Sequence, residues 1–192
     1  YACKTAIRLA AYLEGTAMPK ALVSGMKKET TRTLEKAPVC SQYSLSPMQQ
    51  GIYVQSVLDL DGISYNMPGA FLLNEKPDVD KLKKAFEILI REDAIFRTQY
   101  VREKNGLCAE IVRDISIDIE ELDAIDFRLA CEQFVHPFDL EKAPLLRVGL
   151  WKSQEEQWYL FLDSHHIIGD GMSTPLVLKR LDEAYRKGTL RV

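Results

Sequence analysis

Hydrophobic residues spaced three and four positions apart predict helices along much of this chain. The clearest covers residues 79–90, which follow acidic residues suited to a helix N-terminus. Ser46-Pro47 also signals a helix start, because serine is a good N-cap and proline fits the first helical position. The predicted helices cover residues 4–14, 46–58, 79–90 and 126–135, and a last one lies between Gly171 and Gly188.

Strands are predicted where apolar residues alternate or run together. Trp158–Ser164 is apolar on both alternating faces, as is typical of a buried strand. Asn105-Gly106 indicates a hairpin turn between two such segments. The predicted strands cover residues 66–73, 95–101, 108–112, 145–151 and 158–164. Helices and hairpin-like strand pairs are mixed, which indicates an α+β fold with a mixed or antiparallel sheet.

Composition narrows the possible classes of protein. The chain has 192 residues, of which 46% are hydrophobic, so it can bury one core and carry a short appendage. The net charge of −3, with no basic stripe, predicts neither nucleic acid nor a membrane surface as partner. No apolar run is long enough to span a membrane, and a cytoplasmic protein is expected. The four scattered cysteines indicate neither a disulfide framework nor a metal site.

The stretch Ser164–Ser173 carries the candidate chemistry. It brings two of the three histidines, an aspartate and two glycines to the turn between the last predicted strand and the last helix. An imidazole at the end of a strand can accept or orient a proton near neutral pH. We expect the first amides of the following helix to point into the same space and to be able to stabilise an oxyanion. This combination favours acyl transfer.

The motif resembles a known signature. His165-His166-Ile167-Ile168-Gly169-Asp170-Gly171 resembles the His-His-x-x-x-Asp-Gly motif of condensation domains of nonribosomal peptide synthetases, which share the chloramphenicol acetyltransferase-like fold. Two further segments, residues 46–53 and 95–98, look like other core motifs of that family, in the family's order. Residues 138–140 and 143–147 look like the segment that leads into the active-site strands. In one place the chain departs from the pattern, because Glu92-Asp93-Ala94 stands where the second motif usually has a His-Glu-like run.

The resemblance also implies a domain organisation. Residues 1–15 are similar to the last helix of a carrier domain, although the carrier's phosphopantetheine-bearing serine motif is absent. Residues 16–39, rich in Lys, Thr, Glu and Pro, look like a linker. Residues 40–192 then correspond to the N-terminal lobe of a two-lobe condensation domain, a sandwich lobe whose partner lobe is expected outside this sequence.

The residues of the motif are expected to differ in role. By resemblance His166 is the catalytic residue, either as a base or by orienting the acceptor amine, and faces the tunnel between the lobes. His165 points the other way along the strand, so we expect it to be structural. The resemblance implies a buried ion pair between Asp170 and Arg97, while Gly171 turns the chain and lets substrate approach the backbone. Because the two histidines point to opposite faces, no metal site is expected.

The implied function is amide-bond formation in the synthesis of peptide antibiotics and other secondary metabolites. A donor acyl or peptidyl thioester and an acceptor aminoacyl thioester would be carried on 4′-phosphopantetheine, with no cofactor bound directly by this chain. The implied partners are an upstream donor carrier, a downstream acceptor carrier, the second lobe and an adenylation domain. The lobe by itself is expected to be inactive.

Several alternatives stay open. An epimerization domain shares the histidine motif but usually has a tryptophan soon after the motif's serine, where this chain has Thr174. Heterocyclization domains replace the histidines by aspartate. A stand-alone CoA-dependent acyltransferase, and a docking module without activity, are the remaining possibilities.

Overall fold

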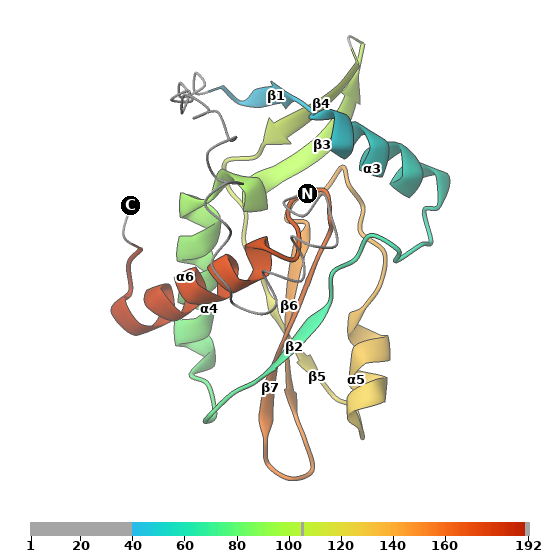
Figure 1. Ribbon diagram of the computed structural model, residues 1–192. Coiled ribbons are helices and arrows are strands. Elements are labelled where there is room, and N and C mark those ends of the chain that lie inside the picture. Colours follow the sequence, from blue (N-terminus) through green and yellow to red (C-terminus); the bar gives the residue numbers. More distant parts are fainter. Residues whose placement is uncertain (1–39, 105, 191–192) are drawn as a thin grey trace, which may run out of the picture. The chain divides into compact units, whose positions relative to one another are not determined.

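The computed structural model describes residues 40–104 and 106–190 (Figure 1). The predicted carrier tail and linker, residues 1–39, lie outside these ranges. Along the chain the elements are β1 (Gln42–Ser44), α3 (Pro47–Leu58), β2 (Gly69–Leu72), α4 (Val79–Glu92), the 3₁₀ helix η1 (Ala94–Arg97), β3 (Thr98–Glu103), β4 (Gly106–Ile111), β5 (Ile119–Leu122), α5 (Phe127–Phe134), β6 (Leu146–Lys152), β7 (Trp158–Ser164) and α6 (Ser173–Lys187).

The described strands form two sheets. One has the order β1-β4-β3 and is antiparallel, and the other has the order β2-β7-β6-β5. In the second sheet β5 runs parallel to β6, and the other pairs are antiparallel. The prediction of an α+β fold with a mixed sheet is therefore confirmed. Among the described helices, none is both long and apolar enough to cross a membrane.

Helices cover both faces of the four-stranded sheet (Figure 1). Leu160 and Leu162 of β7 pack with α4 and α6 on one face, whereas Phe161 packs with Phe134 of α5 on the other. Because side chains alternate along a strand, a central strand covered on both faces must be apolar at successive positions. This arrangement accounts for the continuous apolar run that predicted β7.

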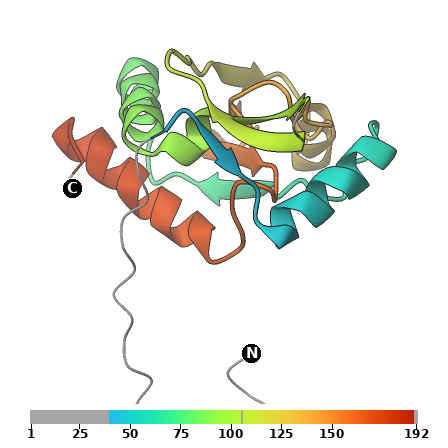
Figure 2. The same ribbon diagram turned by 90° about the horizontal axis from the view of Figure 1, so that it is seen from above.

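Helix α3 takes part in a separate cluster with the three-stranded sheet. Leu45 and Tyr53 pack there with Tyr100 of β3 and with Ile167, just after the histidines. Figure 2 shows α3 and α6 on the same side of the molecule, with the turn that follows β7 between them. The helix has no charged residue. Its start is fixed by a capping box, in which Ser46 and Gln49 each bond to the other's backbone.

Most predicted elements are present, with three differences. Residues 95–97, predicted as the start of a strand, belong to the 3₁₀ helix η1. Strands β1 and β5 were not predicted, because three or four residues do not establish an alternating pattern. The predicted strand at 66–73 is regular only at Gly69–Leu72, and before it Asn66 keeps a single bridge to His165.

Candidate active site

The histidine motif begins where β7 ends, as predicted. Beyond Ser164 the chain keeps a strand-like register with the segment before β2, because Asn66 and His165 form an isolated antiparallel bridge. Met67 N–H donates to the Ser164 carbonyl at 2.8 Å, and His166 N–H donates to the Tyr65 carbonyl at 2.8 Å. The alternation of β7 therefore continues through the two histidines and sends their side chains to opposite faces.

His166 lies on the face that α4 and α6 cover, and its side chain is exposed. It lines a pocket of about 760 Å³ between β2, the region around η1, β7 and the start of α6. The walls are mostly apolar, with Phe71, Leu162 and Val177 among them. An imidazole in such a pocket can meet a bound substrate, so the structure places the predicted catalytic residue where a reaction could occur.

His165 is buried, with 4% of its surface exposed. Its Nδ1 accepts from the Ile167 backbone N–H at 3.2 Å. The Ser56 hydroxyl donates to the Ile52 carbonyl and lies 3.3 Å from Nε2, so Nε2 carries the proton and donates to Ser56. Burial, with a smaller contribution from His166, lowers the pKa of His165 to about 4. His165 is therefore a neutral, fully hydrogen-bonded ring inside the fold.

Asp170 accepts hydrogen bonds in the turn that leads into α6, two residues before its N-cap Met172. Its Oδ1 accepts from the backbone N–H groups of Met172 and Ser173 and from the Ser173 hydroxyl. These hydrogen bonds, the side-chain bond from Ser173 first, lower the pKa of the Asp170 carboxyl. The prediction that the first amides of this helix are available to an oxyanion is wrong for the first of them, Ser173, because Asp170 already uses its N–H.

The predicted buried ion pair between Asp170 and Arg97 is not formed. Asp170 is exposed, and the Arg97 guanidinium donates instead to the carbonyls of Ile90 and Val112, both at 3.0 Å. Arg97 lies at the end of η1, where the carbonyl of Ile90 in α4 and that of Val112, directly after β4, come together. Both residues shape their own turns, but they do so separately.

An ion pair that the sequence did not predict lies in the pocket wall. Asp93, at the end of α4, accepts from Arg180 Nε at 2.8 Å and from a second guanidinium nitrogen at 3.1 Å. It belongs to the Glu92-Asp93-Ala94 segment that departs from the family pattern. The departure was visible in the sequence, but its partner, 87 positions away, was not.

Residues that support the motif were also missed. Gln49 of α3 donates to the Ile167 carbonyl and to the hydroxyl of Tyr100, which in turn donates to the same carbonyl. Gln49 belongs to a segment that the sequence marked only as a core motif. In the structure its side chain joins α3 to the turn after the histidines.

Gly171 lies at the pocket, in open surroundings. A Cβ built there would meet no atom within 4 Å, and φ is not positive. The fold of the described residues does not require glycine at this position. The expected role as an access point for substrate stays a prediction.

The family model described as "Condensation domain" matches residues 39–191 of this chain. Surfactin synthase subunit 1 of Bacillus subtilis (strain 168) is 36% identical over 155 residues, which are 80% of this chain and 4% of that protein. Bacitracin synthase 2 of Bacillus licheniformis is 32% identical over 172 residues, 88% of this chain and 7% of that protein. The chain thus spans only a small part of the length of these relatives.

Solved structures show the same fold. The starter condensation domain of rhizomide synthetase RzmA is similar with a TM-score of 0.68 and 23% identity, over 80% of this chain and 40% of that one. A four-domain nonribosomal peptide synthetase, holo-AB3403 bound to AMP and glycine, gives a TM-score of 0.69 and 21% identity, over 81% of this chain and 12% of that one. The sandwich lobe predicted from the motif is therefore confirmed.

Proposed function

Because the chain belongs to the condensation domain family, we propose that it is the histidine-bearing lobe of a domain that forms amide bonds in a nonribosomal peptide synthetase. The bond joins a donor acyl or peptidyl thioester to the amine of an acceptor aminoacyl thioester. One observation carries the proposal: His166 is exposed in a pocket of about 760 Å³, while the adjacent His165 is buried.

The reaction needs few chemical groups. The acceptor nitrogen attacks the thioester carbonyl carbon, and the C–S bond breaks. The nitrogen loses one proton, and the departing sulfur takes up one proton to become a thiol. An imidazole can take the proton from the nitrogen or stabilise the charge of the intermediate. An α-amine has a pKa of about 8 and is partly deprotonated at neutral pH. His166 can therefore act by orienting the amine as well as by accepting its proton.

The proposal extends to the surroundings of the reaction. Both substrates would reach the pocket on 4′-phosphopantetheine arms of carrier domains, and this chain would bind no cofactor itself. Residues 1–15 would end the donor carrier, residues 16–39 would link it to the lobe, and a second lobe would complete the pocket. An adenylation domain would load the acceptor carrier, and the assembly would work in the cytoplasm. The relatedness to peptide synthetases supports this setting.

The test is His166→Ala in the synthetase that contains this chain, with both carriers loaded. Intact-protein mass spectrometry then follows the condensed thioester on the acceptor carrier. We expect product formation to fall at least ~100-fold, the lower range for a lost acid–base group. His136→Ala is the matched control, because His136 is the other exposed histidine and lies outside the pocket.

Two outcomes would contradict the proposal. Unchanged product from His166→Ala would remove His166 from the reaction. Exchange of the donor's α-proton without condensation would indicate an epimerization domain instead.

A further inference from the structure

The two histidines are fixed in different ways. The ring of His165 is held directly, by Ser56 and the Ile167 amide. His166 is held through its main chain, whose N–H donates to the Tyr65 carbonyl at 2.8 Å. The direction of the His166 side chain therefore depends on where the segment Tyr65–Met67 lies.

That segment is cut off from the regular part of β2. Gly69 pairs with Leu162 and Asn66 with His165, so Pro68 stands opposite Asp163 in the same register. Regular pairing with β7 begins only at Gly69, so before Pro68 the segment keeps the single bridge Asn66–His165. Two backbone hydrogen bonds hold Tyr65–Met67 to the end of β7, from Met67 N–H to Ser164 and from His166 N–H to Tyr65.

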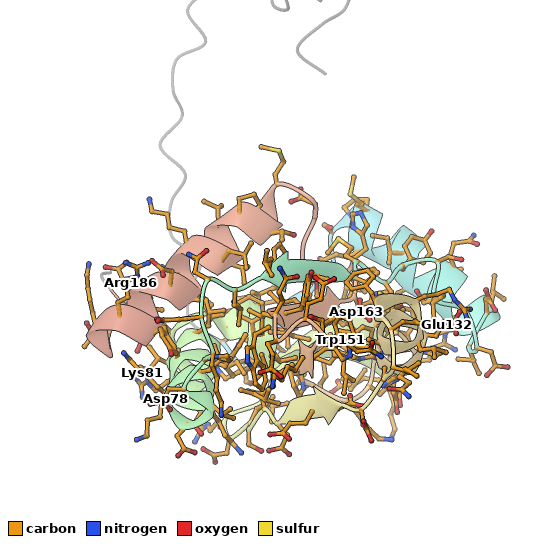
Figure 3. All side chains as sticks on the ribbon, turned by 90° about the horizontal axis from the view of Figure 1, so that it is seen from below. Asp78, Lys81, Glu132, Trp151, Asp163 and Arg186 are labelled. Atoms are coloured by element: carbon orange, nitrogen blue, oxygen red, sulfur yellow. The ribbon has the colours of Figure 1, made fainter. Side chains whose placement is uncertain are left out.

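The side chain of Asn66 supplies a further anchor, to the interior of the fold. Its Nδ2 donates to Asp163 Oδ2 at 2.7 Å and to the His136 carbonyl at 2.9 Å, so both N–H bonds of the amide are used. Asp163 is a residue of β7, three positions before His166, with none of its surface exposed. Figure 3 shows Asp163 in the interior of the molecule, whereas Glu132 and Arg186 lie at its edges.

Asp163 is itself held in place. Arg147 is its partner in the register of β6 and β7, and the guanidinium lies 3.5 Å from Asp163 Oδ2. Arg147 also donates to the His136 and Pro137 carbonyls. One network therefore joins four segments through the side chains of Asn66, Asp163 and Arg147. These segments are Tyr65–Met67, the two central strands β6 and β7, and the residues after α5. Burying a carboxylate is unfavourable, so its presence here calls for a reason beyond packing.

We propose that Asn66 is a positioning residue for His166. Its amide clamps Tyr65–Met67 onto Asp163, which fixes the Tyr65 carbonyl, and this carbonyl sets the main chain that directs the imidazole into the pocket. The inference rests on the proposed function of His166. In this proposal Asn66 sets the distance between the His166 imidazole and the acceptor amine, although Asn66 does not itself contact the substrate.

The first test measures the clamp without using activity. In the synthetase that contains this chain, hydrogen exchange of the His166 amide is followed by mass spectrometry of overlapping peptides. Asn66→Ala should speed this exchange at least tenfold, while amides of α4 keep their wild-type rates. Asn74→Ala is the matched control, since Asn74 is exposed just beyond the other end of β2. Unchanged exchange at His166 would overturn the proposal.

The second test separates positioning from stability. Asn66→Ala leaves a buried carboxylate with one donor fewer and lowers stability for that reason alone. The double variant Asn66→Ala/Asp163→Asn removes the buried charge, and it should melt closer to wild type. Its condensation rate, kcat, should nevertheless stay at least tenfold low with KM within twofold, and its His166 amide should still exchange fast.

A double variant with wild-type kcat would overturn the proposal, as would a loss confined to KM. His166→Ala serves as the reference in the same assay. If that variant condenses normally, the proposed function fails. If His166→Ala is inactive and the Asn66 variants are fully active, only the inference about Asn66 fails.

Discussion

The two adjacent histidines face different surroundings. His165 belongs to an inner face, inside the fold, and His166 to an open face, at the pocket. On the inner face His165 and Asp163 are buried, at 4% and 0% exposure, and side chains from α3 and the segment before β2 bond to them. On the open face His166, Asp170 and Gly171 line a pocket and are exposed. Strand alternation produces the division as far as His166, and the turn that follows carries Asp170 and Gly171 to the pocket.

The same turn must therefore both stabilise the fold, through its inner face, and meet the substrate, through its open face. On the inner face Ser56 and the Ile167 amide satisfy both ring nitrogens of His165, so changes at His165 and Ser56 should act on folding. On the open face Asp170 is bonded to Met172 and Ser173, but Gly171 has open space around it and His166 is exposed. Changes at His166 and Gly171 should therefore act on the reaction. The following predictions start with the largest expected effect on the free energy of unfolding.

Lowering the pH should reduce the free energy of unfolding through His165, on the inner face. An unfolded histidine takes up a proton near its ordinary pKa of 6.5, but folded His165 does so only near pH 4. Between these values the unfolded state binds more protons, so stability falls as pH falls through this window and is independent of this group above it. At about 1.4 kcal/mol for each pKa unit, the loss amounts to about 3 kcal/mol.

Urea unfolding of wild type and His165→Gln across this pH window measures that loss. The variant should lack His165's share of the dependence on pH. His136→Gln, a change at an exposed histidine, should keep it. Parallel pH profiles for wild type and His165→Gln would show that His165 is not the group responsible.

Removing the partner of His165 should have the next largest effect. Ser56→Ala leaves the Nε2–H of a buried ring without its acceptor, which costs about 1–3 kcal/mol. Chemical denaturation gives the difference directly. Ser116→Ala, at an exposed serine, provides the comparison and should change stability little. Equal effects of the two substitutions would mean that the Ser56–His165 bond contributes nothing.

The smallest effect on stability is expected at Gly171. A Cβ at this position meets no atom within 4 Å, so Gly171→Ala should change the free energy of unfolding by less than about 0.5 kcal/mol. At Gly149 a Cβ would lie 2.9 Å from the ring of buried Phe134, and Gly149→Ala should cost about 1–3 kcal/mol.

Product formation by Gly171→Ala then tests the open face. If substrate approaches the backbone there, condensation slows although the fold is as stable as wild type. Full activity of Gly171→Ala would leave the glycine without a role in the reaction.

Local patterns predicted the elements on which the site is built. The strand Trp158–Ser164 has its predicted bounds, and Ser46-Pro47 starts α3 as expected. The buried, structural character of His165 followed from alternation along that strand. These features depend on residues close together in the sequence, so a local pattern is enough to predict them.

Contacts between distant segments were not predictable in the same way. Asn66 and Asp163 are 97 positions apart, and nothing near either one indicates the other. The expected pairing of Arg97 with Asp170 was wrong because backbone carbonyls and amides close to each residue satisfy its charge first. Two polar side chains pair only when the fold brings them together without nearer partners, and a pattern of single residues does not contain that information.

The bond between Ser56 and His165 has a consequence for the synthesis of the chain. Its two residues are 109 positions apart, and α3 has its packing partners at Tyr100, Leu145 and Ile167. At about 5–20 residues per second, a ribosome needs roughly 5 to 20 seconds to make the residues between Ser56 and His165. During that interval the cluster that α3 joins stays incomplete, because Ile167 follows His165 in the chain. The site is therefore among the last parts of the lobe to form.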